Sequence, residues 1–111
     1  MTLALAYLAI ASPTRVLFLG NSHTSTHDVP GMVRNLLAKP GEPEIYVEMR
    51  TSGFLNDFAQ RQDVRDSIRR GKWSHVILQG ASISSSHRYR YSQEGGIALA
   101  NLAREAGSDV Y

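Results

Sequence analysis

The chain has 111 residues, 42% of them hydrophobic and 20% charged, which suits one small globular domain and excludes a disordered chain. Its formal net charge of +2 is too small to indicate a nucleic-acid partner. The absence of cysteine excludes disulfides and thiolate metal sites, and no apolar run is long enough to span a bilayer.

The first eleven residues, MTLALAYLAIA, are apolar throughout and close on an A-x-A-like site. This pattern favours the end of a secretion signal, and hence a secreted or periplasmic protein; without a signal the expected location is cytoplasmic. No Lys or Arg precedes the apolar stretch, so an additional apolar helix or a misassigned start is the alternative. We leave residues 1–11 out of the fold prediction.

The first predicted strand is Arg15–Leu19, whose unbroken apolar run indicates burial on both faces, as in a parallel sheet. A polar loop, Gly20–His27, follows it. Asp28 is a predicted helix cap, and Pro30 suits the first helical turn. The apolar residues of this helix recur at helical spacing on one face: Met32, Val33, Leu36 and Leu37.

The second half of the chain repeats the alternation of strands and helices. Residues 44–50 alternate apolar and polar, which predicts a half-buried strand near a sheet edge. One helix, capped by Ser52 or Asn56, is expected to run to Gly71. The remaining predicted elements are a strand at 73–79, a long polar loop at 80–91, a helix from Ser92 to about 106 and the start of a strand at 109–111.

The element order β-α-β-α-β-α-(β) predicts an α/β fold, with a parallel sheet between two helical layers and flavodoxin-like connections. The fourth strand has only three residues. We therefore expect residues 15–111 to be the amino-terminal part of one α/β domain, truncated after the third helix.

Loops that follow parallel strands meet at one edge of the sheet, so residues far apart in sequence can converge there. The first such loop offers the Ser22 hydroxyl, the second the Gly53 backbone N–H, and the third the Gln79 amide or the Ser82 hydroxyl. Acyl transfer needs a nucleophile and oxyanion donors of these kinds. The alternative is structural: Ser22 and Gly53 would serve turns, and Gln79 would bridge loop backbones.

V-L-F-L-G-N-S-H-T, followed by V-P-G-M-V-R-N-L-L, resembles block I of the SGNH (GDSL-like) hydrolases, in the branch with G-N-S-x-T. The Gly53 loop is placed like the block II glycine of that family. W-S-H-V-I-L-Q-G-A-S resembles the third strand of the same branch. The resemblance covers most of residues 15–111.

The resemblance implies a three-layer α/β/α fold and hydrolysis of a small-molecule or carbohydrate ester, without a cofactor or metal. It implies that Ser22 is the nucleophile and that the Ser22 and Gly53 N–H groups are oxyanion donors. The chain departs from the pattern at block III, because a G-x-N-D motif would fall on residues 80–83, where no Asn is present. Gln79 is the preferred substitute, since a primary amide most resembles Asn, with Ser82 as the alternate.

The Asp-x-x-His motif that supplies the base in this family is absent from the chain. His23 adjoins the serine, so the two side chains tend to diverge. His75 lies about 13 Å before Gln79, at the wrong end of its strand. His27 is near a helix start, where the dipole disfavours an imidazolium. His87 is the remaining in-chain candidate, in a loop on the correct edge.

Residues 87–91 interleave two arginines with two tyrosines. Substrate contact, carbohydrate stacking and single-strand binding are conceivable uses, but a solvated loop is the simplest interpretation. A different class of function also fits the first loop. Gly20–Thr26 could hold a phosphate through backbone N–H groups and hydroxyls, as in a non-catalytic flavodoxin-like nucleotide-binding module.

Overall fold

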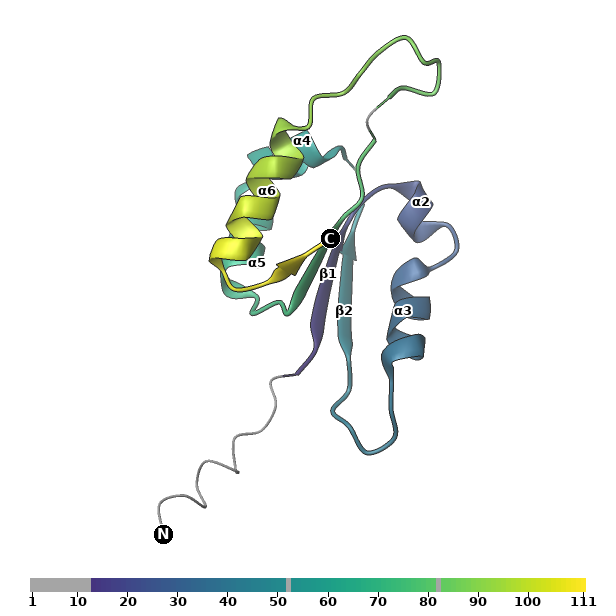
Figure 1. Cartoon of the computed structure of the whole chain (residues 1–111), viewed down its shortest axis with the longest axis vertical. Helices are drawn as coiled ribbons and strands as arrows, with labels where there is room; N and C mark the ends of the chain where they lie inside the picture. The colour runs from purple at the N-terminus through teal and green to yellow at the C-terminus, as the bar shows by residue number, and fades with distance from the viewer. Residues whose placement is uncertain (1–12, 52, 82) are drawn as a thin grey trace.

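A single parallel sheet organises the molecule (Figure 1). The computed structural model describes residues 13–51, 53–81 and 83–111, so the apolar leader, Ser52 and Ser82 lie outside the described residues. The strands lie in the order β2-β1-β3-β4, which is the flavodoxin-like order. Their bounds are β1 (Arg15–Leu19), β2 (Tyr46–Arg50), β3 (His75–Leu78) and β4 (Asp109–Val110). The parallel sheet confirms the predicted fold class.

Helices lie on both sides of the sheet, giving three layers (Figure 1). Two of them follow β1 and lie on one side, and three lie on the other. The first group is α2 (Ser22–Ser25) and α3 (Val29–Leu37); the second is α4 (Leu55–Gln60), α5 (Gln62–Arg70) and α6 (Glu94–Glu105). The predicted three-layer α/β/α arrangement is therefore confirmed. Among the described residues, no helix is long and apolar enough to cross a membrane.

β1 is buried on both faces, as its apolar run predicts. Leu17 and Leu19 join the main core beneath α4, α5 and α6, whereas Val16 and Phe18 point to the opposite face. β2 is an edge strand, as predicted, although it begins at Tyr46. The other fully or nearly buried apolar residues of the core are Phe58, Ala59, Val64, Ile68, Trp73, Val76, Leu99 and Ala103.

The single helix expected to end at Gly71 is two helices, and that prediction is wrong. Arg61, with φ −87° and ψ 122°, breaks the helix between α4 and α5. In a continuous helix Val64 would point about 120° away from Phe58, at 3.6 residues per turn. The break resets the phase, so both side chains are fully buried in the same core.

The start of α4 also differs from the prediction. Phe54 is the N-cap residue, and the Asp57 carboxylate accepts a hydrogen bond from its backbone N–H at 2.9 Å. Asn56 lies inside the helix instead of capping it. Its side chain accepts from the Gly95 N–H at 2.7 Å and thereby joins α4 to the start of α6.

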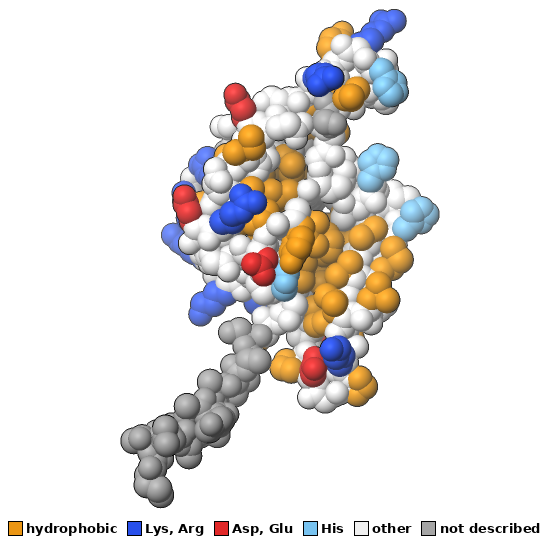
Figure 2. Space-filling view, in the orientation of Figure 1, with side chains coloured by type: hydrophobic (Ala, Val, Ile, Leu, Met, Phe, Trp, Pro, Cys, Tyr) orange, Lys and Arg blue, Asp and Glu red, His pale blue; other side chains and the backbone are white. Residues whose placement is uncertain are grey.

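α3 begins as predicted but does not bury its apolar face. The Asp28 carboxylate accepts from the Gly31 N–H at 3.2 Å, and Pro30 lies in the first turn. Yet Met32, Leu36 and Leu37 are 48%, 83% and 46% exposed. Figure 2 shows hydrophobic side chains gathered over this side of the molecule. The amphipathic pattern therefore predicted the helix correctly, but its apolar residues are not buried against the sheet.

The carboxyl-terminal elements follow the prediction within a residue or two. α6 begins at Glu94, whose N–H donates to the Ser92 hydroxyl at 3.2 Å. Trp73 is 4% exposed, and its indole N–H donates to the Ser67 carbonyl at 2.9 Å, which ties β3 to α5. After α6, Gly107 adopts φ +91°, a left-handed conformation suited to glycine, and the chain enters β4.

Candidate active site at the carboxyl edge of the sheet

Ser22 lies two residues beyond the carboxyl end of β1. The Gly20 N–H donates to the Arg50 carbonyl at 3.1 Å, so the chain leaves the sheet beside β2. Asn21 then caps α2, its side-chain oxygen accepting from the His23 N–H at 3.0 Å. This cap places Ser22 at the first position of a short helix, with its side chain exposed.

Ser22 and Gly53 share the wall of one surface cavity, of about 380 Å³. The loops after β1 and β2 thus meet, as expected for neighbouring parallel strands. The cavity carries no charged side chain among its described lining residues, which are Asn21, Ser22, Ser25, Thr51, Gly53 and Phe54. Hydroxyls and backbone groups dominate this wall.

The geometry leaves backbone donors beside the serine. As the first residue of α2, Ser22 has an N–H group without an intrahelical acceptor. Gly53 contributes backbone alone to the cavity wall. A Cβ built at this glycine would lie 3.3 Å from the Asp57 Cβ, so a larger residue would crowd the start of α4. These two N–H groups are the predicted oxyanion donors, and that role stays a prediction.

Gln79 bridges the first and third loops. Its side-chain oxygen accepts from the Asn21 N–H at 3.1 Å and from the Thr24 hydroxyl at 2.9 Å. Its amide N–H₂ donates to the Gly80 carbonyl at 3.2 Å. The structural alternative considered in the sequence analysis, in which Gln79 bridges loop backbones, is therefore observed. The oxyanion role of Gln79 stays a prediction.

The bridge leaves no room for a side chain at Gly20. A Cβ at that position would lie 2.6 Å from the Thr24 hydroxyl and 3.0 Å from the Gln79 side-chain oxygen. Thr24 is 5% exposed, so its hydroxyl is buried where the loops after β1 and β3 pack together. The glycine of the G-N-S-H-T stretch is thus required by a close approach of polar groups.

The histidines do not gather around Ser22. His75 begins β3 at the opposite edge of the sheet, as predicted; its ring is 2.9 Å from the Ser74 hydroxyl and stacks on Tyr111. His87 lies in the turn of the loop that follows β3, with φ +61°, and is not among the residues that line the serine cavity. His23, the second residue of α2, and His27, which follows that helix, are both exposed, and neither lines the serine cavity.

Within residues 13–51, 53–81 and 83–111, no group of three or more His, Asp or Glu side chains could hold a metal ion. The hydrogen bond from Arg61 holds the pKa of Asp63 below its usual value, despite an opposing desolvation effect. Asp63 lies on α5, outside the serine cavity.

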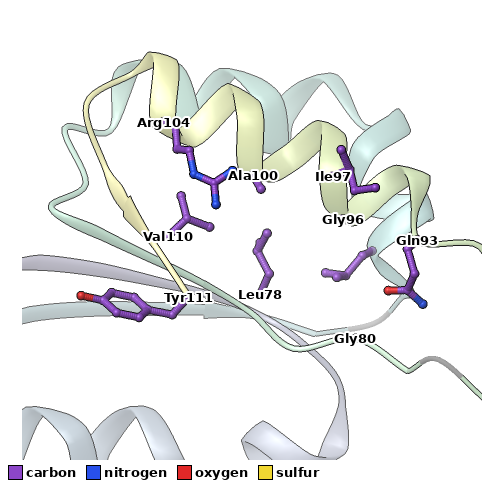
Figure 3. A pocket seen from close by; sticks show the side chains of 10 residues that line it. Leu78, Gly80, Gln93, Gly96, Ile97, Ala100, Arg104, Val110 and Tyr111 are labelled. Atoms are coloured by element: carbon purple, nitrogen blue, oxygen red, sulfur yellow. The ribbon is translucent and has the colours of Figure 1, made fainter.

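A second, larger cavity of about 460 Å³ lies between α6 and the β3–β4 side of the sheet (Figure 3). Leu78, Ile97 and Val110 give it apolar walls, and Arg104 extends into it from α6. Its described lining residues include no serine, histidine or carboxylate side chain. We therefore place the candidate chemistry at the smaller Ser22 cavity.

Sequence analysis missed one aromatic member of the Ser22 site. Phe54 is 50% exposed and follows Gly53 directly in the chain. An apolar residue next to a predicted oxyanion glycine was the signal that could have revealed it. Ser82, the alternate to Gln79, lies outside the described residues.

Comparison with family models, curated proteins and solved structures finds no match to the chain.

Proposed function

We propose that this chain carries the nucleophile and oxyanion half of a serine ester hydrolase of the SGNH type. The observation that supports it is the placement of Ser22, exposed at the first position of α2 and sharing a cavity with Gly53. Nucleophile and oxyanion donors must lie around one small volume where the ester carbonyl can sit.

In this proposal the Ser22 hydroxyl attacks the carbonyl carbon of an ester or acetyl ester. The Ser22 and Gly53 N–H groups face the developing oxyanion, and Gln79 either donates to it or holds the loop in place. A general base must take the hydroxyl proton. Because no described histidine lines the cavity, residues 1–111 alone are expected to show no Ser22-dependent turnover.

The test uses protein expressed from the complete reading frame, with an aryl acetate as substrate. Ser22→Ala is expected to lower kcat by at least about a thousandfold, as for loss of a serine nucleophile. Thr26→Ala removes an exposed hydroxyl from the same segment and is the matched control, expected to retain activity. Unchanged turnover in Ser22→Ala would refute the proposal.

The contacts favour this function over a phosphate-binding module. α2 has only four residues, and the Asn21 side chain already accepts one of its amide N–H groups. The next helix, α3, begins with the Asp28 carboxylate, which opposes a bound anion. Titration with FMN separates the two functions, since the esterase proposal predicts no saturable binding.

A further inference from the structure

An exposed aromatic pair lies beside the Ser22 cavity. The rings of Phe54 and Tyr91 have centroids 4.9 Å apart and planes tilted by 35°. Phe54 is 50% exposed and Tyr91 is 36% exposed. One ring comes from the loop after β2 and the other from the loop before α6, so the pair brings these two loops into contact.

A cavity of about 160 Å³ opens next to this pair. A cavity of about 150 Å³ is large enough to bind benzene. The walls combine the two aromatic rings with Leu55 and small residues; the described lining residues are Phe54, Leu55, Asn56, Asp57, Gly80, Ala81, Tyr91, Ser92, Gln93 and Gly96.

Several polar atoms of this cavity are hydrogen-bonded within the fold. The Asn56 oxygen accepts from the Gly95 N–H at 2.7 Å, and an Asp57 oxygen accepts from the Phe54 N–H at 2.9 Å. The Gln93 amide donates to the Tyr91 carbonyl at 3.2 Å.

Phe54 lines both this cavity and the cavity of Ser22 and Gly53. A group attached to an ester carbonyl at Ser22 would thus reach the aromatic pair by passing along one side chain. We propose that Phe54 and Tyr91 form a subsite for a six-membered aromatic ring, carried by the acyl or alcohol part of the ester. Its use in catalysis rests on the proposed esterase function, but ring binding does not.

The test measures ring binding without chemistry, on the 111-residue chain. 4-Fluorobenzyl alcohol is titrated and followed by ¹⁹F NMR. Phe54→Ala and Tyr91→Ala are each expected to raise Kd by about threefold to tenfold, the range for loss of one aromatic contact. Tyr89→Ala, which removes a 69% exposed ring from the same loop outside the cavity, is the control and is expected to leave Kd unchanged.

Absence of saturable binding, or equal Kd values in the three variants, would overturn the subsite. Phe54→Leu keeps an apolar side chain at the start of α4 and guards against misfolding; it too is expected to weaken binding. Ser22→Ala is expected to bind the ring with unchanged Kd. Ring binding that survives alongside an inactive full-length enzyme would reject the esterase and retain the subsite, so the two failures are distinguishable.

Discussion

Gln79 offers the sharpest test of how the loops are held together. Its side-chain oxygen accepts from the Asn21 N–H and the Thr24 hydroxyl, and its amide donates to the Gly80 carbonyl. Gln79→Ala deletes all three hydrogen bonds. It leaves the hydroxyl of Thr24, a residue that is 5% exposed, and the N–H of the half-buried Asn21 without their acceptor.

The expected loss follows from these contacts. A net contribution of about 0.5–1.5 kcal/mol for each of the two acceptor bonds gives a destabilisation of about 1–3 kcal/mol. The bond to Gly80 is solvent-exposed and adds little. In a domain of this size each 1 kcal/mol lowers Tm by about 4–8 °C, which thermal unfolding followed by circular dichroism detects readily.

Two further variants separate the bridge from an oxyanion role. Thr24→Val removes one donor while keeping the shape, and a double-mutant cycle with Gln79→Ala should give a coupling energy of about 0.5–1.5 kcal/mol. Gln79→Glu keeps an acceptor for both bonds but lacks the amide donor and turns a carboxylate oxygen toward the Gly80 carbonyl, so it should destabilise the fold less than Gln79→Ala does. If Gln79 also donates to the oxyanion, this variant loses kcat on an aryl acetate while remaining folded.

Two results would contradict the proposed bridge: Gln79→Ala unfolds at the wild-type temperature, or its effect and that of Thr24→Val simply add. An unchanged Tm would mean that the two acceptor bonds contribute nothing to stability, and additive effects would mean that the bond between Thr24 and Gln79 contributes nothing. The loop after β1 would then have to be held by its own cap and by the sheet.

Three smaller perturbations test other parts of the structure. Gly20→Ala places a methyl group against the Gln79 oxygen, and urea unfolding should show a loss of about 1–3 kcal/mol. Leu36→Lys changes a residue that is 83% exposed, so its effect on the same measurement should stay within about 0.5 kcal/mol. Arg61→Gln should raise the pKa of Asp63 in an NMR titration, since Arg61 is the main cause of its lowering. A lowered carboxyl pKa stabilises the fold above the unfolded pKa, and this contribution is lost as the pH falls through the folded value. The variant should therefore be slightly less stable than the wild type at neutral pH, and the difference should disappear in acid.

The strands were predictable because burial on both faces leaves an unbroken apolar run. Arg15–Leu19 is β1 residue for residue, and the last three residues of β3 are the partly or fully buried apolar triplet Val76, Ile77 and Leu78. The shared sheet edge then followed from the rule for parallel strands. It brought Ser22 and Gly53 to one cavity without any local signal linking them.

The misses come from tertiary packing that the local pattern does not encode. The break at Arg61 follows no Gly or Pro; it exists because Val64 and Phe58 must face the same core. The pairing of Phe54 with Tyr91 depends on where two loops meet in space. The hydrogen bond that the Gln79 side-chain oxygen accepts likewise comes from a residue far away in sequence, Thr24.

The most direct test of the central claim is the site of covalent modification. Protein from the complete reading frame is treated with a fluorophosphonate, and the adduct is located by peptide mass mapping. The account predicts a stoichiometric adduct on Ser22, lost together with aryl acetate turnover in Ser22→Ala. An adduct on a different serine, with turnover that survives Ser22→Ala, would contradict it.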